Sequence, residues 1–134
     1  MLKFKWVIKM KWISEIKNIG SEALAPEERV VILFGENAND DLKKVSVIQN
    51  FEDEDALKSL VLKKGDTVTI DGTTYLINYV GSLVNSNLRA LQHVSLFFTK
   101  TPKKPMSNAV YLECDEKDAL PDFRVNDEIV YEHL

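Results

Sequence analysis

Residues 67–76, TVTIDGTTYL, decide the fold class. Two runs rich in β-branched and aromatic residues flank the pair Asp71-Gly72, whose backbones accept the positive φ angles of a type I′ turn. The stretch therefore predicts a β-hairpin, whose second strand continues to Val80 and ends before Gly81.

Further short strands are predicted on both sides of this hairpin. Apolar residues at even positions alternate with lysines at odd positions up to Trp12, which predicts a strand that ends at Gly20. The remaining predicted strands are residues 30–34, 45–48, 94–98, 110–112 and 129–131.

Two short helices complete the pattern. Residues 54–61 have helical spacing of leucine and valine and stop before Gly65, and residues 87–92 follow the capping cluster Asn85-Ser86-Asn87. Residues 35–41 and 101–105 are predicted loops. Seven or eight strands spaced by about ten residues predict a mainly β protein, either an antiparallel barrel or a sandwich.

The composition fits one domain spanning residues 1–134. A hydrophobic content of 45% excludes a disordered chain, and the lone Cys114 excludes a disulfide scaffold. A net charge of −4 makes the protein a poor general binder of nucleic acid. No signal peptide or membrane-spanning stretch is visible, so we expect a cytoplasmic protein.

Charge is unevenly distributed. Residues 1–20 hold five lysines against one glutamate, whereas residues 113–134 hold eight acids against Lys117 and Arg124. The two charged regions either meet within the fold or are solvated, or they dock to a charged partner protein.

Most familiar catalytic motifs are absent. The sequence has no phosphate loop, no glycine-rich dinucleotide turn, no nucleophile elbow and no cysteine–histidine cluster for zinc. Asp40-Asp41 and the acidic run 52–55 lack the spacing of a calcium loop. We therefore expect no metal and no cofactor. On an alternating strand, Trp6 and Trp12 point away from the lysines and are predicted to be core residues.

Two segments carry a family resemblance. Residues 79–82, YVGS, and 87–96, NLRALQHVSL, resemble the glucitol/sorbitol-specific IIA component of the bacterial sugar phosphotransferase system. That family has approximately V-G-S, a four-residue gap, then N-L-R-x-L-G-H-V-T-L. Here Gln92 replaces the glycine and Ser95 the threonine. A weaker likeness extends over about residues 12–132, which leaves 1–11 as an amino-terminal extension with Met10 as a candidate start.

The resemblance implies a compact closed antiparallel β-barrel with one or two short helices that works in a cytoplasmic phosphorelay. In such relays the carrier protein HPr passes a phosphoryl group to a histidine of the IIA protein. That histidine passes it to the IIB domain of the IIB/IIC membrane transporter, which phosphorylates the incoming sugar alcohol. The implied partners are HPr and this transporter.

The expected acceptor histidine is missing. The family pattern has I-H-x-H after a V-x-I strand, whereas this chain has Ile48-Gln49-Asn50, so Gln49 occupies the acceptor position. An amide nitrogen has its lone pair in resonance and cannot take a phosphoryl group, unlike a neutral imidazole. His93 matches a second histidine of the family pattern. It either has a structural role at the end of the short helix, or lines the pocket of position 49 and accepts the phosphoryl group itself.

The rest of the expected pocket is Asn50, Gly81 and Asn87. His133 lies second from the end and is predicted to be frayed. Three hypotheses follow. The protein is a divergent phosphocarrier that uses His93, or a phosphorylation-deficient IIA-like binding or regulatory module. Alternatively it is a plain barrel that binds a sugar or polyol in a pocket lined by Tyr75, Tyr79 and Phe97.

Overall fold

The predicted hairpin is present in the computed structural model, which describes residues 9–134. Strands β4 (Thr67–Ile70) and β5 (Thr73–Val80) pair antiparallel, with Ile70 opposite Thr73. Asp71 and Gly72 have φ angles of 51° and 75°. These values fit the type I′ turn that the sequence predicts.

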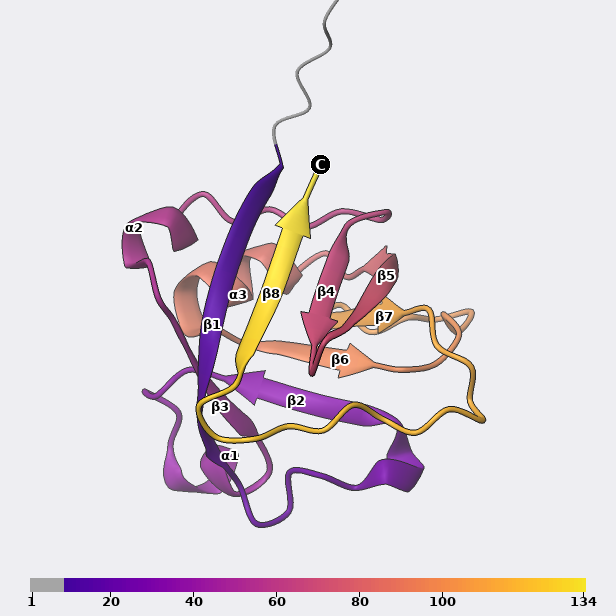
Figure 1. Cartoon of the computed structure of the whole chain (residues 1–134), viewed down its shortest axis with the longest axis horizontal. Coiled ribbons are helices and arrows are strands. Elements are labelled where there is room, and N and C mark those ends of the chain that lie inside the picture. Colours follow the sequence, from indigo (N-terminus) through magenta and orange to yellow (C-terminus); the bar gives the residue numbers. More distant parts are fainter. Residues whose placement is uncertain (1–8) are drawn as a thin grey trace, which may run out of the picture.

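Eight strands close into a barrel in the order β1-β3-β2-β6-β7-β5-β4-β8 (Figure 1). The barrel settles the choice against a sandwich. The seams β2–β3 and β6–β7 are parallel, and the other strand pairs are antiparallel. The remaining strands are β1 (Met10–Ile19), β2 (Val30–Phe34), β3 (Val47–Phe51), β6 (Val94–Phe97), β7 (Ala109–Leu112) and β8 (Glu128–His133).

Within residues 9–134, three short α-helices and a 3-10 turn connect the strands. They are η1 (Pro26–Glu28), α1 (Asp40–Lys44), α2 (Glu54–Leu57) and α3 (Val84–Leu91). Figure 1 places α2 and the end of β8 at one end of the barrel and α1 at the other. Among the helices of residues 9–134, none has the length and hydropathy needed to cross a membrane.

Three details of the predicted helices are wrong. Part of the predicted loop 35–41 begins α1, because the Asn39 side chain accepts a hydrogen bond from the Leu42 amide and caps a helix. Helix α2 stops at Leu57, since Leu60 and Leu62 turn into the core. The cluster at 85–87 lies inside α3 instead of capping it: the Asn85 amide binds the backbone of Leu62, with N–O distances of 2.8 and 3.1 Å.

The barrel interior is mainly apolar. The alternation predicted for the first strand holds along β1 from Trp12 onward, where Trp12, Ser14 and Ile16 are buried, whereas Met10 is 37% exposed. Trp6 and the other residues of the pattern before position 9 lie outside the described residues. Of the three buried side chains, Ser14 is polar. Its hydroxyl belongs to a group of hydrogen-bonded polar side chains inside the barrel, together with Gln49 and Tyr131.

Candidate functional site

Gln49 lies inside the barrel. It sits on β3 between the buried Val47 and Phe51, and its side chain is completely inaccessible to solvent. Alternation along a strand places the next residue, Asn50, on the outer side, where it is half-buried. A partner protein therefore cannot touch the side chain at position 49 in this conformation.

Three hydrogen bonds hold the Gln49 amide. Its Oε1 accepts from the Ser14 hydroxyl at 2.6 Å and from the Tyr131 hydroxyl at 2.8 Å. Its Nε2 donates to the backbone oxygen of Gln92 at 2.9 Å. Burial raises the pKa of Tyr131, so its hydroxyl stays protonated and remains a donor to Gln49. A buried amide with these partners is a structural hub.

Gln92 covers the Gln49 side chain from the end of α3. It follows α3 in the left-handed conformation with φ 52°, a position where glycine is favoured. Its side chain Oε1 accepts a hydrogen bond from the Phe51 amide at 2.9 Å. Gln49 and Gln92, two of the residues that depart from the family pattern, therefore contact each other, and Gln92 also binds β3, the strand that carries Gln49.

His93 points to the outer side of the barrel. Its neighbours on β6, Val94 and Leu96, belong to the core, whereas its ring stacks on Phe34 at a centroid distance of 4.0 Å. Nδ1 lies 2.9 Å from the Leu33 carbonyl oxygen, and Nε2 lies 3.2 Å from the Asn108 side-chain nitrogen. Since a carbonyl only accepts and an amide NH₂ only donates, Nδ1 carries the proton and Nε2 accepts.

His93 and Gln49 are linked only indirectly by hydrogen bonds. Their side chains share no hydrogen bond, and their link is the Gln92 backbone, which precedes His93 and accepts from Gln49. Of the two roles considered for His93, this geometry fits the structural one. Its ring fastens to β2, while its backbone amide donates to the Asn87 oxygen of α3 at 3.3 Å.

The other expected pocket residues are dispersed. Gly81 is buried before α3, where an added Cβ would lie 2.3 Å from the Ser107 oxygen. It lines a cavity of about 380 Å³ that includes Lys63, Lys64 and Tyr79, but not Gln49, Asn50 or Asn87. Asn87 is half-buried on α3.

The sequence analysis missed the environment of His133. The residue lies in β8 opposite Met10 and is therefore not frayed. Its Nδ1 is 2.7 Å from Oδ2 of the buried Asp66. The alternation Ile129, Tyr131, His133 could have revealed that the strand continues, but no local signal identifies Asp66 as the partner.

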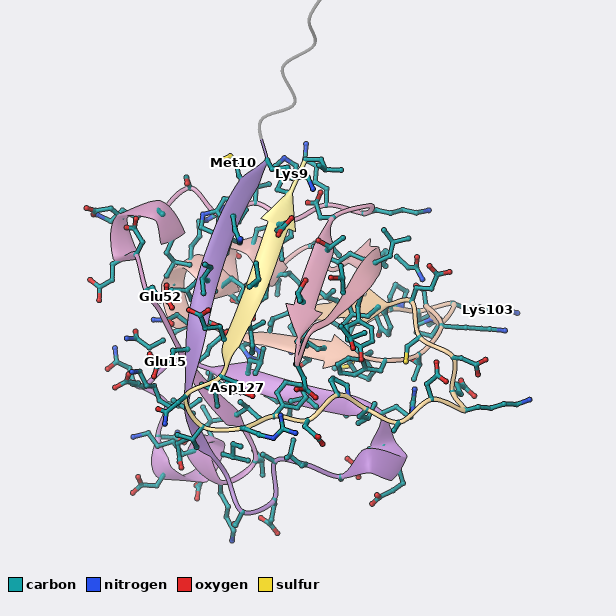
Figure 2. The ribbon with its side chains drawn as sticks, viewed as in Figure 1. Lys9, Met10, Glu15, Glu52, Lys103 and Asp127 are labelled. Carbon is teal, nitrogen blue, oxygen red and sulfur yellow. The ribbon has the colours of Figure 1, made fainter. Side chains whose placement is uncertain are left out.

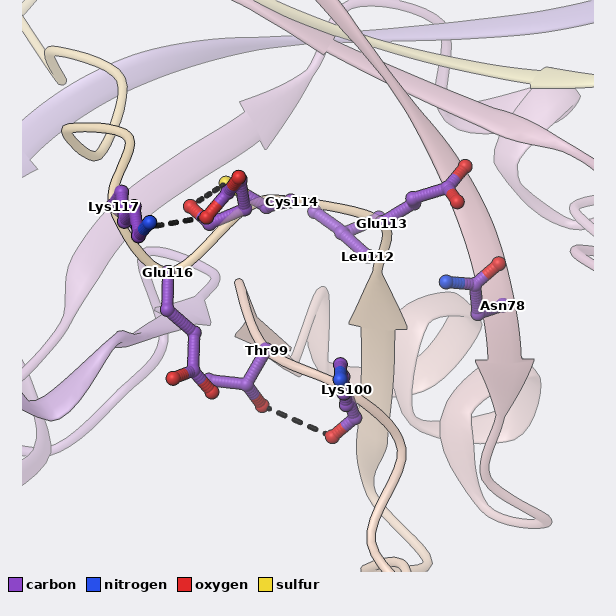
Figure 3. Close-up of a pocket in the computed structure, with 9 residues that line it drawn as sticks. Asn78, Thr99, Lys100, Leu112, Glu113, Cys114, Glu116 and Lys117 are labelled. Carbon is purple, nitrogen blue, oxygen red and sulfur yellow. Dashed lines mark hydrogen bonds between the residues drawn. The ribbon is translucent and has the colours of Figure 1, made fainter.

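Two further hollows lie on the described surface. The larger, about 620 Å³, is lined by charged residues of both signs, among them Lys100, Glu113 and Lys117 (Figure 3). The smaller, about 330 Å³, lies outside Gln92 and includes Phe34 and Leu91. Within residues 9–134, no group of three His, Cys, Asp or Glu side chains could hold a metal ion.

Tyr75, Tyr79 and Phe97 do not line any of the cavities described here together. Tyr75 packs edge-on against Phe98, with ring centroids 5.2 Å apart, and is buried in the core. Phe97 stacks on Tyr111 with ring centroids 4.9 Å apart, and Tyr79 contacts the same Tyr111 edge-on at 6.0 Å. Tyr79 is the one member of the predicted trio that lines any of the cavities described here.

The oppositely charged ends of the chain meet in part. β1 and β8 pair, and Lys9 Nζ lies 3.9 Å from a Glu132 carboxylate oxygen. Figure 2 shows Glu15 and Glu52 on the side of the barrel formed by β1. There, hydrogen bonding with Glu128, desolvation, and repulsion from Glu128 and Glu15 raise the pKa of Glu52.

Comparison with known proteins identifies the class. The family model for the glucitol/sorbitol-specific IIA component of the phosphotransferase system matches residues 11–130. The chain is also similar to the crystal structure of a phosphotransferase system IIA component from Enterococcus faecalis V583. The identity is 36% and the TM-score 0.80, covering 89% of this chain and 98% of that one. No protein of curated function matches the sequence. The chain therefore belongs to the glucitol/sorbitol-specific IIA family.

Proposed function

We propose that this protein is a IIA-type component that acts by binding its phosphotransferase partners, without carrying a phosphoryl group at position 49. The observation that carries the proposal is the contact between Gln49 and Gln92. Gln49 replaces the histidine of the family pattern, and Gln92 replaces the glycine. Together they occupy the position where the acceptor would act and are held there by hydrogen bonds.

The chemistry at position 49 supports this proposal. A phosphoryl acceptor needs a lone pair that can reach the phosphorus atom of the donor. The Gln49 nitrogen has no available lone pair, and its oxygen already accepts hydrogen bonds from Ser14 and Tyr131. The residue is also fully buried.

Transfer through His93 has less support. His93 is only 8% exposed, and both of its ring nitrogens have hydrogen-bond partners in the protein. Phosphorylation of Nε2 would require the Asn108 amide to move away and the ring to leave its shielded place. The structure thus favours the binding module over the phosphocarrier that uses His93.

The outer side of the closed site offers a place for a partner. Leu91, at the end of α3, is 53% exposed and lies on the rim of the 330 Å³ hollow. Phe34, Leu42 and Leu91 give that hollow an apolar character, which suits the buried centre of a protein interface. We place HPr or the IIB domain of a sugar-alcohol transporter here, in the cytoplasm.

Calorimetric titration of the full chain with unphosphorylated HPr and with a IIB domain tests the proposal. We expect binding to at least one of them, weakened about tenfold or more by Leu91→Glu. Val125→Glu is the matched control, because Val125 is similarly exposed at 48% but lies outside the hollow. Absence of binding to both proteins would contradict the proposal.

A further inference from the structure

We infer that His133 and Asp66 form a phosphoryl-acceptor site, separate from position 49, at the end of the barrel where β8 meets the start of β4. His133 ends β8, and its neighbour Glu132 pairs with Thr67. The inference rests on the proposed function in one respect: membership of the phosphotransferase system indicates that the transferred group is a phosphoryl group. It does not depend on which partner protein docks.

Asp66 is fixed as an acceptor of hydrogen bonds. Its side chain is 5% exposed. Oδ2 accepts from the Lys63 amide at 2.7 Å, and Oδ1 accepts from the Leu134 amide at 3.3 Å. The same Oδ2 lies 2.7 Å from Nδ1 of His133. When the imidazole is neutral, the carboxylate holds its proton on Nδ1 and leaves the lone pair on Nε2.

Nε2 of His133 is the nitrogen that can react. Among residues 9–134, the His133 ring makes no hydrogen bond besides the one to Asp66, and its side chain is 19% exposed. His93 differs, because both of its nitrogens are engaged. The chain has two histidines, and His133 is the one whose ring has a nitrogen without a hydrogen-bond partner among residues 9–134.

The surroundings suit a phosphoryl group. Lys63 and Lys64 are exposed and lie in the turn that leads to Asp66, so the chain next to this pair carries positive charge. In the transfer step, the Nε2 lone pair forms the N–P bond while the bond from phosphorus to the donor's leaving group breaks. When the donor is phosphoramidate, its nitrogen takes the electron pair of the broken bond and leaves as ammonia. The phosphorylated ring keeps its Nδ1 proton, and its positive charge is balanced by the Asp66 carboxylate.

Phosphorylation of the full chain by phosphoramidate tests the inference without any partner protein, so its outcome is separate from that of the binding experiment. Peptide mass spectrometry should find the phosphoryl group on His133, and phosphorus NMR should assign it to Nε2. His93→Gln should keep the label and His133→Gln should lose it.

Asp66→Asn isolates the positioning role of the carboxylate. It should slow labelling of His133 by about tenfold or more, since the neighbouring group that orients a reactive imidazole has effects of this size. Circular dichroism checks that Asp66→Asn is folded. If it is not, Asp66→Glu is tested in its place, and this variant should retain labelling of His133 because it keeps a carboxylate. Labelling on His93, no label under conditions that phosphorylate free histidine, or equal rates for wild type and a folded Asp66→Asn would overturn the inference.

Discussion

A single buried amide, Gln49, connects three strands and the end of a helix. Ser14 belongs to β1, Tyr131 to β8 and Gln49 itself to β3, while its nitrogen reaches the residue after α3. At this position in the family pattern, a histidine carries the chemistry. Here the residue supports the barrel interior, and its contacts explain why it is fully buried.

Replacing Gln49 with leucine should destabilise the protein by about 2–4 kcal/mol. The hydroxyl groups of Ser14 and Tyr131 lose their shared acceptor and stay buried, and each unsatisfied group costs about 1–3 kcal/mol. Urea unfolding measures the change. Asn50→Ala, on the outer side of the same strand, should stay within about 0.5 kcal/mol. Equal effects of the two variants would contradict the assignment of Gln49 as a hub.

Replacing Gln92 with glycine should have opposing effects. Glycine relieves the positive φ of 52°, a gain of roughly 1 kcal/mol, but the Phe51 amide loses its acceptor, a loss of about 1 kcal/mol. Global stability should therefore change little, whereas hydrogen exchange of the Phe51 amide should accelerate by roughly fivefold. Unchanged exchange there would show that the Gln92 side chain does not close the site.

At the scale of elements, the strands were more predictable than the helices. The β-branched apolar run at 30–34 and the Asp71-Gly72 turn are local signals, and they place β2, β4 and β5 well. Helix ends depend on distant partners: Asn85 looks like a cap in the sequence, but the backbone of Leu62, brought close by tertiary packing, takes its amide. Asp66 and His133 are 67 positions apart, so their pairing has no local signal either.

The entry into α3 depends on close backbone contact at Gly81. An added Cβ would lie 2.3 Å from the Ser107 oxygen and 2.7 Å from the Met106 oxygen, and backbone atoms yield little. Gly81→Ala should therefore cost about 3 kcal/mol or more in urea unfolding. Gly72→Ala is the control: its Cβ has open space, so only its φ of 75° matters, at about 1–2 kcal/mol. The reverse order of the two losses would refute this account of Gly81.

At the scale of the whole molecule, closure of the barrel places the first and last strands side by side and gathers carboxylates there. Glu15 on β1 lies opposite Glu128 on β8, and Glu52 follows β3. Because the pKa of Glu52 is raised in the folded state, its protonated form favours folding. Its contribution to stability is present below the ordinary pKa of 4.5 and is lost as the pH rises through the raised value.

Glu52→Gln should remove this pH dependence. The variant should match the wild type in thermal unfolding below pH 4.5 and unfold at a higher temperature than the wild type at neutral pH, because repulsion from Glu128 and Glu15 is gone. Scans of Tm from acid to neutral pH measure the difference. Glu113→Gln, at an exposed glutamate beyond the end of β7, should follow the wild-type profile throughout. A Glu52→Gln profile parallel to that of the wild type would contradict the prediction.

The central claim is that residues 49 and 92 close the family's acceptor site together. Its most direct test is phosphoryl transfer from phosphoenolpyruvate through enzyme I and HPr to three proteins, followed by peptide mass spectrometry at positions 49 and 93. Wild type and Gln49→His should carry no phosphoryl group there, whereas Gln49→His combined with Gln92→Gly should carry one on residue 49. Labelling of His93 in the wild type, or of residue 49 in the single variant as fast as in the double variant, would contradict the account.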